Sequence, residues 1–305
     1  MADQHKTPKL KRNSSAAADA VPASILNRKG ARNTAAVSAD VRALLNAGLI
    51  ESVNLCEWLI VDHERLAENV FPELGWQSCL PQVSSALKNL KTPTALKKTF
   101  AVGEILAQLH TSKTAAASAF ESLRDHSSDT VRTWACALIG QKTAITLAEK
   151  LSLLQPLAAD PNMGVREIAW MAARPLISQQ LPEAIQLLSS WVQNKDERIR
   201  RFASEATRPR GVWCAHIKEL KESPELALSL LVPLRSDESK YVRDSVANWL
   251  NDASKSRPDF VRQTCQTWLS ESPTPATQAI VKRALRTLKK NETLGAFRYK
   301  MTPIE

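Results

Sequence analysis

Carboxylates, amides and arginines recur at matching positions in three consecutive segments of the chain, where they could carry out charge-dependent chemistry. When the aliphatic residue that opens each segment is set at zero on a helical wheel, positions +2, +6, +9 and +10 fall in one sector away from the core face. The residues in this sector are Glu167 and Arg174, then Arg201, Glu205 and Arg208, then Asp244, Asn248, Asn251 and Asp252. Carboxylates in a water-poor groove can stabilise a developing positive charge and position water, and arginine binds phosphate through two N–H groups.

The second of these segments continues into a basic loop that carries an aromatic residue. Arg208, Arg210 and Trp213 lie close together in the sequence, and a tryptophan in such a loop can stack on a base or a sugar. A solvated helix face would also be polar. However, the sector contains no lysine, and its mixture of acids, amides and arginines fits a preorganised network. We therefore expect these side chains to line one groove.

The elements that must position these side chains belong to a repeat. Four segments share an aliphatic residue, an arginine, two variable residues and a small apolar residue, and they begin at Val131, Val165, Ile199 and Val242. The steps between them are 34, 34 and 43 residues, with another expected helix between successive copies. Two helices per unit at this period are typical of an α-solenoid. We predict an all-α fold, a superhelix of stacked HEAT-like helical-hairpin repeats.

A second spacing supports this prediction. Asp160 lies six residues before Arg166, and Asp237 lies six residues before Arg243. This spacing resembles the HEAT repeat, in which the Asp and the Arg form a ladder between adjacent turns of the solenoid. We therefore assign structural roles to the repeated arginines, which are Arg132, Arg166, Arg200 and Arg243. We also expect packing roles for Trp134, Trp170, Trp191, Trp249 and Trp268.

The chain divides into a basic tail and a repeat domain. Residues 1–37 are rich in lysine, serine, alanine and asparagine and lack an apolar period, which predicts a disordered tail. A solubilising role and a non-specific DNA-tethering role would both fit this tail. Ser38 is a candidate N-cap, so we expect the HEAT-like domain to cover residues 38–305.

Charge and cysteine usage narrow the class of partner. The formal net charge of the 305 residues is +10, which favours an acidic partner, with nucleic acid ahead of a membrane surface. The five cysteines are dispersed without CxxC spacing, which argues against a zinc site or disulfides and fits a reduced, cytoplasmic setting. The five histidines are scattered, and no apolar run approaches the length of a membrane span. We expect neither a metal ion nor an organic cofactor.

Longer stretches of the sequence resemble one enzyme family. These stretches are 165–170, 201–210, 241–252 and 284–288. They resemble the bacterial AlkC branch of the HEAT-like alkylpurine DNA glycosylases, the AlkC/AlkD superfamily. The resemblance is dense over residues 125–290, and the asparagine-containing stretch that ends at Asp252 is its most specific part.

The resemblance implies a monofunctional glycosylase of base excision repair. Such an enzyme hydrolyses the N-glycosidic bond of cationic N-alkylated bases, chiefly 3-methyladenine, in duplex DNA and without base flipping. The resemblance implies active-site positions at Glu167, Arg201, Glu205, Trp213 and Asp252. We further expect a monomer in the bacterial cytoplasm, associated with the nucleoid when it is bound to DNA.

From the wheel and the resemblance together we assign roles to the residues. The expected catalytic residues are Glu205, Asp252 and Glu167. The expected DNA-binding residues are Arg201, Arg208, Arg210, Trp213, Arg174, Asn248 and Asn251. A cationic base is already a good leaving group, and carboxylates stabilise the oxocarbenium-like sugar that its loss produces. The alternatives are a non-catalytic HEAT-repeat scaffold that binds nucleic acid and a protein-binding solenoid, and release of bases from methylated DNA would distinguish them from an enzyme.

Overall fold

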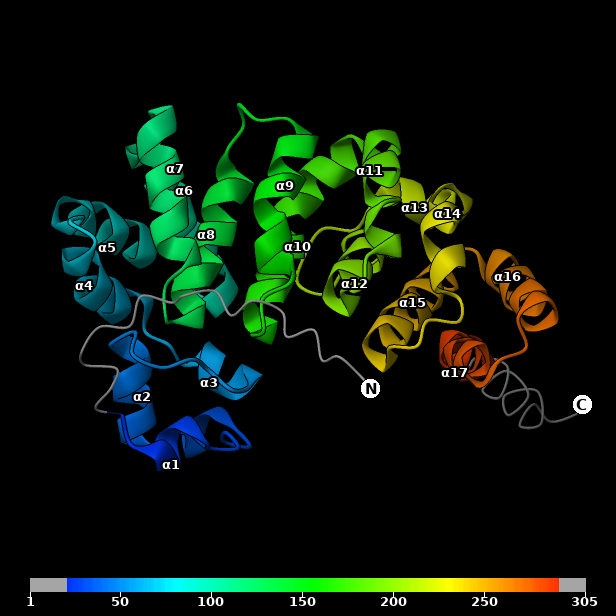
Figure 1. The fold of residues 1–305 in the computed structure, drawn as a ribbon, viewed down its shortest axis with the longest axis horizontal. Coiled ribbons are helices and arrows are strands. Elements are labelled where there is room, and N and C mark those ends of the chain that lie inside the picture. Colours follow the sequence, from blue (N-terminus) through cyan, green and yellow to red (C-terminus); the bar gives the residue numbers. More distant parts are fainter. Residues whose placement is uncertain (1–20, 291–305) are drawn as a thin grey trace, which may run out of the picture. The chain divides into compact units, whose positions relative to one another are not determined.

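The computed structural model describes residues 21–290, and their regular elements are helices that form two compact units (Figure 1). The first unit takes residues up to 145 together with 160–172, and the second takes 146–159 together with the residues from 173 onward. The first unit contains α1 (Ala23–Leu26), η2 (Thr34–Ala36), α2 (Ala39–Asn46), α3 (Leu55–Leu59), α4 (His63–Glu73), η3 (Gln77–Cys79), α5 (Leu80–Lys88), α6 (Ala95–Leu109), α7 (Lys113–Arg124), α8 (Asp129–Gln141) and the first part of α10 (Met163–Gln179). The second contains α9 (Leu147–Ala158), the rest of α10, α11 (Leu181–Leu188), η4 (Trp191–Gln193), α12 (Glu197–Ala206), α13 (Lys218–Glu222), η5 (Pro224–Ala227), α14 (Leu228–Leu231), η6 (Val232–Leu234), α15 (Lys240–Ala253), α16 (Pro258–Glu271) and α17 (Pro275–Ala284).

Side-chain caps fix where the repeated helices begin. Ser128, Asp196 and Ser239 cap α8, α12 and α15, and each lies three residues before the aliphatic residue that opens its repeat. A capping oxygen satisfies N–H groups that have no partner in the first turn of a helix. The caps therefore give the three helices the same register, which brings equivalent positions of successive repeats to equivalent places. Ser38 caps α2 as the sequence predicts.

Neighbouring helices pack through small residues and buried tryptophans. In the first unit α6 packs against α8, and a Cβ added at Gly103 of α6 would lie 2.4 Å from the Cβ of Ala137. In the second unit α12 packs against α15, and α15 packs against α17. The five tryptophans with expected packing roles are all buried, which confirms that expectation: Trp134, Trp170, Trp191, Trp249 and Trp268.

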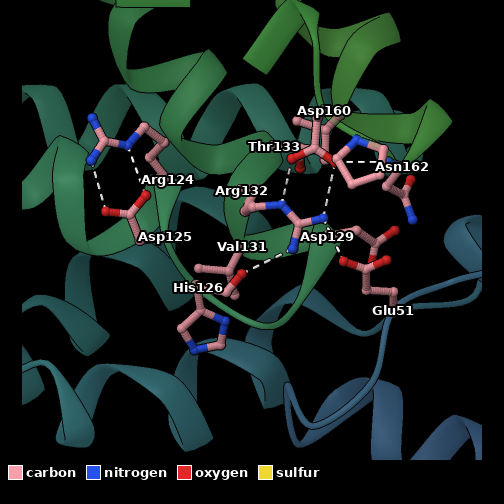
Figure 2. A network of polar contacts seen from close by, with 12 residues as sticks. Glu51, Arg124, Asp125, His126, Asp129, Val131, Arg132, Thr133, Asp160 and Asn162 are labelled. Atoms are coloured by element: carbon pink, nitrogen blue, oxygen red, sulfur yellow. Dashed lines mark hydrogen bonds and ion pairs between the residues drawn. The ribbon is translucent and has the colours of Figure 1, made fainter. Parts of the chain in front are cut away.

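The arginine–aspartate ladder is present in both units. In the first unit Nε and Nη2 of Arg132 donate to the carboxylate of Asp160 at 2.8 and 3.1 Å, and Nη1 donates to two carbonyl oxygens of the preceding loop (Figure 2). In the second unit Arg200 reaches Asp237 in the same way, at 2.7 and 3.0 Å. Its Nη1 also donates to two carbonyl oxygens of the loop before its own helix.

The other two repeated arginines are likewise bound to backbone. Arg166 donates to the carbonyl oxygens of Asp160 and Pro161, and Arg243 donates to those of Asp237 and Glu238. The structural roles that the sequence predicts for the repeated arginines are therefore confirmed.

The N-terminal segment differs from the expectation of a disordered tail to residue 37. Residues 21–37 fold onto the first unit, and the side chains of Val21 and Val37 are buried. Arg28 donates to both carboxylate oxygens of Glu57, at 2.9 and 2.6 Å, and to the carbonyl oxygen of Glu51. Composition alone did not reveal this segment because contacts formed over a long sequence separation, the Arg28–Glu57 ion pair and the burial of Val21 and Val37, hold it in place. Residues 1–20 of the expected tail lie outside the described residues. None of the described helices is long and apolar enough to cross a membrane.

The ladder predicts a large effect on stability when one partner is lost. Asp160→Ala removes the carboxylate that both Nε and Nη2 of Arg132 contact, and it leaves the buried guanidinium with Glu51, whose Oε1 lies 2.6 Å from Nη2. Losing one partner of a buried pair costs about 3–5 kcal/mol of unfolding free energy, and the remaining contact with Glu51 places the expected loss at the lower end of that range. Chemical denaturation followed by circular dichroism measures the loss. Asp125→Ala is the matched control, since the Arg124–Asp125 pair is partly exposed (Figure 2) and should contribute at most about 1 kcal/mol. Equal losses in the two variants would contradict the structural importance of the ladder.

A buried histidine predicts that the first unit is sensitive to acid. His63 is fully buried, and its Nδ1 accepts a hydrogen bond from Nε1 of Trp134 at 3.1 Å. Burial and the charge of Lys98 lower the pKa of His63 from 6.5 to about 3. Since the folded pKa is the lower one, the unfolded chain binds the proton first, and stability falls by about 1.4 kcal/mol per pH unit as the pH drops from 6.5 toward 3.

His63→Gln keeps an acceptor for the tryptophan and removes the titrating group, so its stability should fall less on acidification. Burial raises the pKa of Asp129 to about 6, which acts in the opposite direction, but this group titrates in both proteins and cancels in the comparison. Urea denaturation at several pH values measures the difference, and parallel pH profiles for the two proteins would refute the assignment.

Candidate functional site

Several polar residues that the helical wheel places in one sector meet in the second unit, where α12 and α15 pack side by side (Figure 1). Glu205, at the C-terminal end of α12, is only 4% exposed. Its Oε1 accepts a hydrogen bond from Nη1 of Arg208 at 2.6 Å, and its Oε2 accepts one from Oγ of Ser245 at 2.6 Å. Nη2 of Arg201 lies 3.6 Å from Oε2. Both carboxylate oxygens are therefore held by donors from two neighbouring repeats.

The charges around Glu205 keep it ionised. Burial by itself raises the pKa of this carboxyl, but the charges of Arg201 and Arg208 and the hydrogen bonds from Ser245 and Arg208 outweigh it, so the pKa lies below its ordinary value. Burial likewise disfavours the charge of Arg208, yet Glu205 and Asp252 raise its pKa. The group thus holds opposite charges in a place with little water, where their fields are weakly screened.

A second buried carboxylate shares the same guanidinium. Asp252, near the end of α15, is 4% exposed, and its Oδ2 accepts from Nε of Arg208 at 2.8 Å and lies 2.7 Å from Nη2. Its Oδ1 accepts a longer hydrogen bond, 3.2 Å, from Nζ of Lys255. Arg208 therefore joins two carboxylates that lie 47 positions apart in the sequence. The wheel prediction that Glu205, Arg208 and Asp252 share one sector agrees with this geometry.

Arg201 is held beside this cluster by an aromatic ring. Its guanidinium carbon lies 4.4 Å from the centre of the ring of Tyr241, which is a distance at which a cation interacts favourably with an aromatic face. Tyr241 belongs to α15, so this contact also joins the two helices.

The buried side chain of Arg174 binds the backbone of the basic loop after α12. This side chain is only 3% exposed, and it donates to the carbonyl oxygens of Ala206, Arg208 and Ala215 at 2.8, 2.6 and 3.0 Å. The sequence assigned a DNA contact to Arg174, and the structure does not support that role, because the guanidinium is buried under the loop and bound to backbone. Its visible role is to position the loop.

The tip of the loop presents an exposed aromatic residue in a strained conformation. Trp213 is 58% exposed, and its φ of 62° lies in the left-handed region that non-glycine residues rarely adopt. Val212 beside it is also exposed. Arg210 donates to Oγ of Ser256 at 2.7 Å. Strain of this kind persists only where surrounding contacts impose it, and it is concentrated at functional sites.

The two predicted asparagines differ in accessibility. Asn251 is buried, and its Nδ2 donates to the carbonyl oxygen of Ala284 and to Oγ1 of Thr287, both at 2.9 Å. The DNA contact expected of Asn251 is therefore not supported, since this amide ties α15 to the end of α17. Asn248 is more accessible, and its Oδ1 accepts hydrogen bonds from Arg283 and Arg286.

Glu167 belongs to the first unit. It lies on α10, half-buried, and its Oε2 accepts a hydrogen bond from Nε1 of Trp170 at 2.8 Å. Its catalytic role stays a prediction. Among the residues that the structure describes, no group of three His, Cys, Asp or Glu side chains is arranged to hold a metal ion.

Sequence reasoning missed several groups around the carboxylates. Ser245 occupies position +3 of its repeat, where the other three repeats have Trp134, Ile168 and Phe202. A hydroxyl at a position otherwise filled by bulky apolar side chains was a signal that could have identified it. Tyr241 and Lys255 flank the repeat segment, and nothing in the wheel distinguishes them. Arg283 lies on α17 and Arg286 follows that helix, and both lie after the three segments to which the helical wheel was applied.

The chain is similar to proteins that act on alkylated DNA. The sequence model of a family described as DNA alkylation repair enzymes matches residues 101–288. A protein of Bacillus subtilis, the uncharacterized protein YhaZ, is 41% identical over 131 residues. That match covers 42% of this chain and 36% of the relative, so the chain matches about a third of the length of that relative.

Two solved structures are similar to the fold. The alkylpurine DNA glycosylase AlkC of Pseudomonas fluorescens, bound to DNA containing an abasic site analogue, aligns with a TM-score of 0.62 and 25% identity over 75% of this chain and 61% of that one. AlkD2 of Streptococcus mutans aligns with a TM-score of 0.51 and 22% identity over 68% of this chain and 97% of that one.

These similarities agree with the sequence analysis on two points. The predicted fold class, an all-α solenoid of HEAT-like repeats, is confirmed by the helical structure and by both solved structures. The resemblance to the AlkC/AlkD superfamily is confirmed by the family match, which covers α12, α15 and the residues Glu205, Arg208 and Asp252. Because the family match extends over more than half of its residues, this chain belongs to the family of DNA alkylation repair enzymes.

Proposed function

We propose that this protein is a monofunctional DNA glycosylase that removes cationic N-alkylated bases, chiefly 3-methyladenine, from duplex DNA without flipping them. The observation that carries the proposal is the joining of two buried carboxylates, Glu205 and Asp252, by the single guanidinium of Arg208. Family membership and the similarity to a glycosylase solved with abasic DNA support DNA as the partner. A purely DNA-binding or protein-binding scaffold would leave these buried carboxylates unexplained.

The chemical step needs negative charge more than it needs an acid. An alkylated base that already carries a positive charge leaves readily, so its protonation is not required. Cleavage of the N-glycosidic bond leaves positive charge on the sugar, and carboxylates stabilise such oxocarbenium-like species. Preorganised charges in a site with little water are effective because they need no reorganisation during the reaction. Water then adds to the sugar carbon and loses a proton, which gives the free base and an abasic site.

The contacts suggest a division of labour between the two carboxylates. Both oxygens of Glu205 are occupied, by Arg208 and by Ser245, which fits a fixed negative charge that acts through its field. Among the described residues Oδ1 of Asp252 is bound by Lys255 alone, whose side chain is 43% exposed. This oxygen is therefore the better candidate to accept a hydrogen bond from the attacking water. Glu167, in the first unit, is proposed separately as a further catalytic carboxylate.

Arginines and the loop tryptophan are proposed to bind the DNA. Arg201, Arg208 and Arg210 lie on or beside α12, and Arg208 acts chiefly through the carboxylates that it joins. Trp213 projects from the loop into solvent, where it can stack on the lesion or on the sugar that remains. Asn248 is proposed to act through the arginines that it binds. A monomer in the bacterial cytoplasm fits this role.

The first test removes the charge of Glu205 and keeps its shape. Glu205→Gln should slow single-turnover release of 3-methyladenine by about two orders of magnitude or more, the usual effect of losing one preorganised electrostatic group. Affinity for DNA with an abasic analogue and the melting temperature should change little. Glu238→Gln makes the same charge change at a side chain that is 92% exposed and should release base at the wild-type rate. A wild-type rate in Glu205→Gln would exclude its proposed role.

The second test concerns Trp213. Trp213→Gly removes the ring and places a residue that tolerates a φ of 62°, so the melting temperature should stay the same or rise. Loss of stacking should weaken binding to abasic DNA by about 1–3 kcal/mol, or about 5- to 150-fold. Trp213→Phe keeps an aromatic face and should retain most of the affinity. Equal affinities of the glycine variant and the wild type, measured by fluorescence anisotropy, would remove Trp213 from the interface.

A further inference from the structure

Two arginines, one on α17 and one just after it, donate hydrogen bonds to the same amide oxygen. Nε of Arg283 and Nη2 of Arg286 both donate to Oδ1 of Asn248, at 3.2 and 3.1 Å. Arg286 also donates to the carbonyl oxygen of Arg283 at 3.1 Å. Two guanidinium groups are therefore held next to each other, at the place where α15 and α17 pack together.

The positive charge of this pair is only partly neutralised. Nη1 of Arg283 lies 3.1 Å from Oδ1 of Asp244, but Oδ2 of that carboxylate also binds Nζ of Lys240, at 2.6 Å. Arg286 has no carboxylate partner among the residues that the structure describes. Asn248 accepts hydrogen bonds without supplying a charge. A carboxylate at position 248 would have neutralised the pair, whereas the amide orients both groups and leaves their charge available.

The pair lies beside the carboxylate cluster. Asn248 precedes Asp252 by four residues on α15, so the two side chains project from the same face of the helix, one turn apart. In agreement with this, partial burial and the charge of Arg283 lower the pKa of Arg286, while the charge of Asp252 acts in the opposite direction. An anion that met this pair would thus be held next to Asp252 without contacting it.

We propose that Arg283 and Arg286 form a binding site for one backbone phosphate of the DNA, beside the nucleotide that loses its base. This inference rests on the proposed function, since it takes DNA as the ligand. Guanidinium groups bind phosphate through paired N–H donors, and an anion between the two arginines relieves their mutual repulsion. The site has a clear use: Glu205 and Asp252 repel the phosphates of a strand, and a fixed cationic contact at the border of the cluster holds the strand in place despite that repulsion.

The salt dependence of DNA binding tests the site. Full-length Arg286→Ala and Lys282→Ala are compared with the wild type on a fluorescent duplex that contains an abasic analogue, between about 50 and 200 mM salt. Lys282 is the matched control, because it is an exposed cation on α17, four residues before Arg286, and Asn248 accepts its hydrogen bonds from Arg283 and Arg286 instead. Arg286→Ala should lower the slope of log K against log salt by about 0.9, the effect of one lost phosphate contact. Lys282→Ala should lower it by less than half as much, and equal slopes for the two variants would overturn the site.

A variant that gains affinity keeps the test valid if Arg286→Ala is destabilised. Asp244→Asn removes the carboxylate that competes for Arg283, so it should bind the duplex severalfold more tightly than the wild type. Asp259→Asn makes the same change in net charge on α16, at a side chain that is 97% exposed, and should alter affinity much less. Equal changes in the two variants would mean that only net charge matters and would overturn the site.

Base release by the wild type, measured separately on methylated DNA, distinguishes failure of the phosphate site from failure of the glycosylase proposal. Release together with equal slopes for Arg286→Ala and Lys282→Ala leaves the glycosylase proposal intact and rejects the phosphate site. No release together with the predicted loss of slope keeps the phosphate site and rejects the glycosylase.

Discussion

A carboxylate buried between helices must be paired with a cation, and in the second unit one guanidinium pairs with two of them. Glu205 and Asp252 are each almost inaccessible, and Arg208 donates to both. The penalty for removing charges from water makes such an arrangement unfavourable unless every member is held in good geometry. The register of α12 and α15, the loop that carries Arg208 and the packing of Tyr241 under Arg201 all serve this requirement. The chemistry proposed for the protein depends on the same group of charges.

The same pair of residue types has a different consequence elsewhere in the fold. In the ladder, Nε and Nη2 of Arg132 reach one aspartate and Nη1 reaches two carbonyl oxygens, so the guanidinium is fully bound. Arg200 repeats this pattern. Such pairs are closed and can only stabilise. Around Asp252 the pairing is more open, because among the described residues Oδ1 accepts a hydrogen bond from Lys255 alone, a side chain that is 43% exposed, and an open pair is what a reacting water or a charged ligand requires. Arg208 is bound as completely as Arg132, by Glu205 and Asp252, so the two places differ at the carboxylate and not at the arginine.

Sequence reasoning succeeded for residues whose positions follow from the helical repeat. It failed for residues whose exposure depends on a segment that packs over them. The repeat and its N-caps fix which residues of α12 and α15 face each other, which is why Glu205, Arg208 and Asp252 could be grouped from a helical wheel. The wheel also selected Arg174 and Asn251, which occupy the same sector but are buried. The loop after α12 covers Arg174, and the end of α17 binds Asn251. A wheel describes one helix and contains no information about what lies across it. The ordered segment 21–37 escaped prediction for a related reason, since its composition is that of a tail and contacts with residues distant in the sequence, such as the Arg28–Glu57 ion pair, hold it.

In the proposed function, binding and chemistry draw on charges of opposite sign. The chain carries a net charge of +10, and exposed cations such as Arg286 would attract the phosphates of DNA from a distance. Their field is screened within about 10 Å at ordinary salt concentrations. The carboxylates of Glu205 and Asp252 are paired with Arg208, so they weaken that attraction little at long range, yet close to the cluster they act through a medium with little water and are screened far less. A cationic base brought close to the cluster would meet negative charge, whereas the backbone that carries it would meet arginine. A neutral, undamaged base would gain nothing from the carboxylates. Discrimination of damage can therefore come from the charge of the lesion itself, without a pocket that encloses the base.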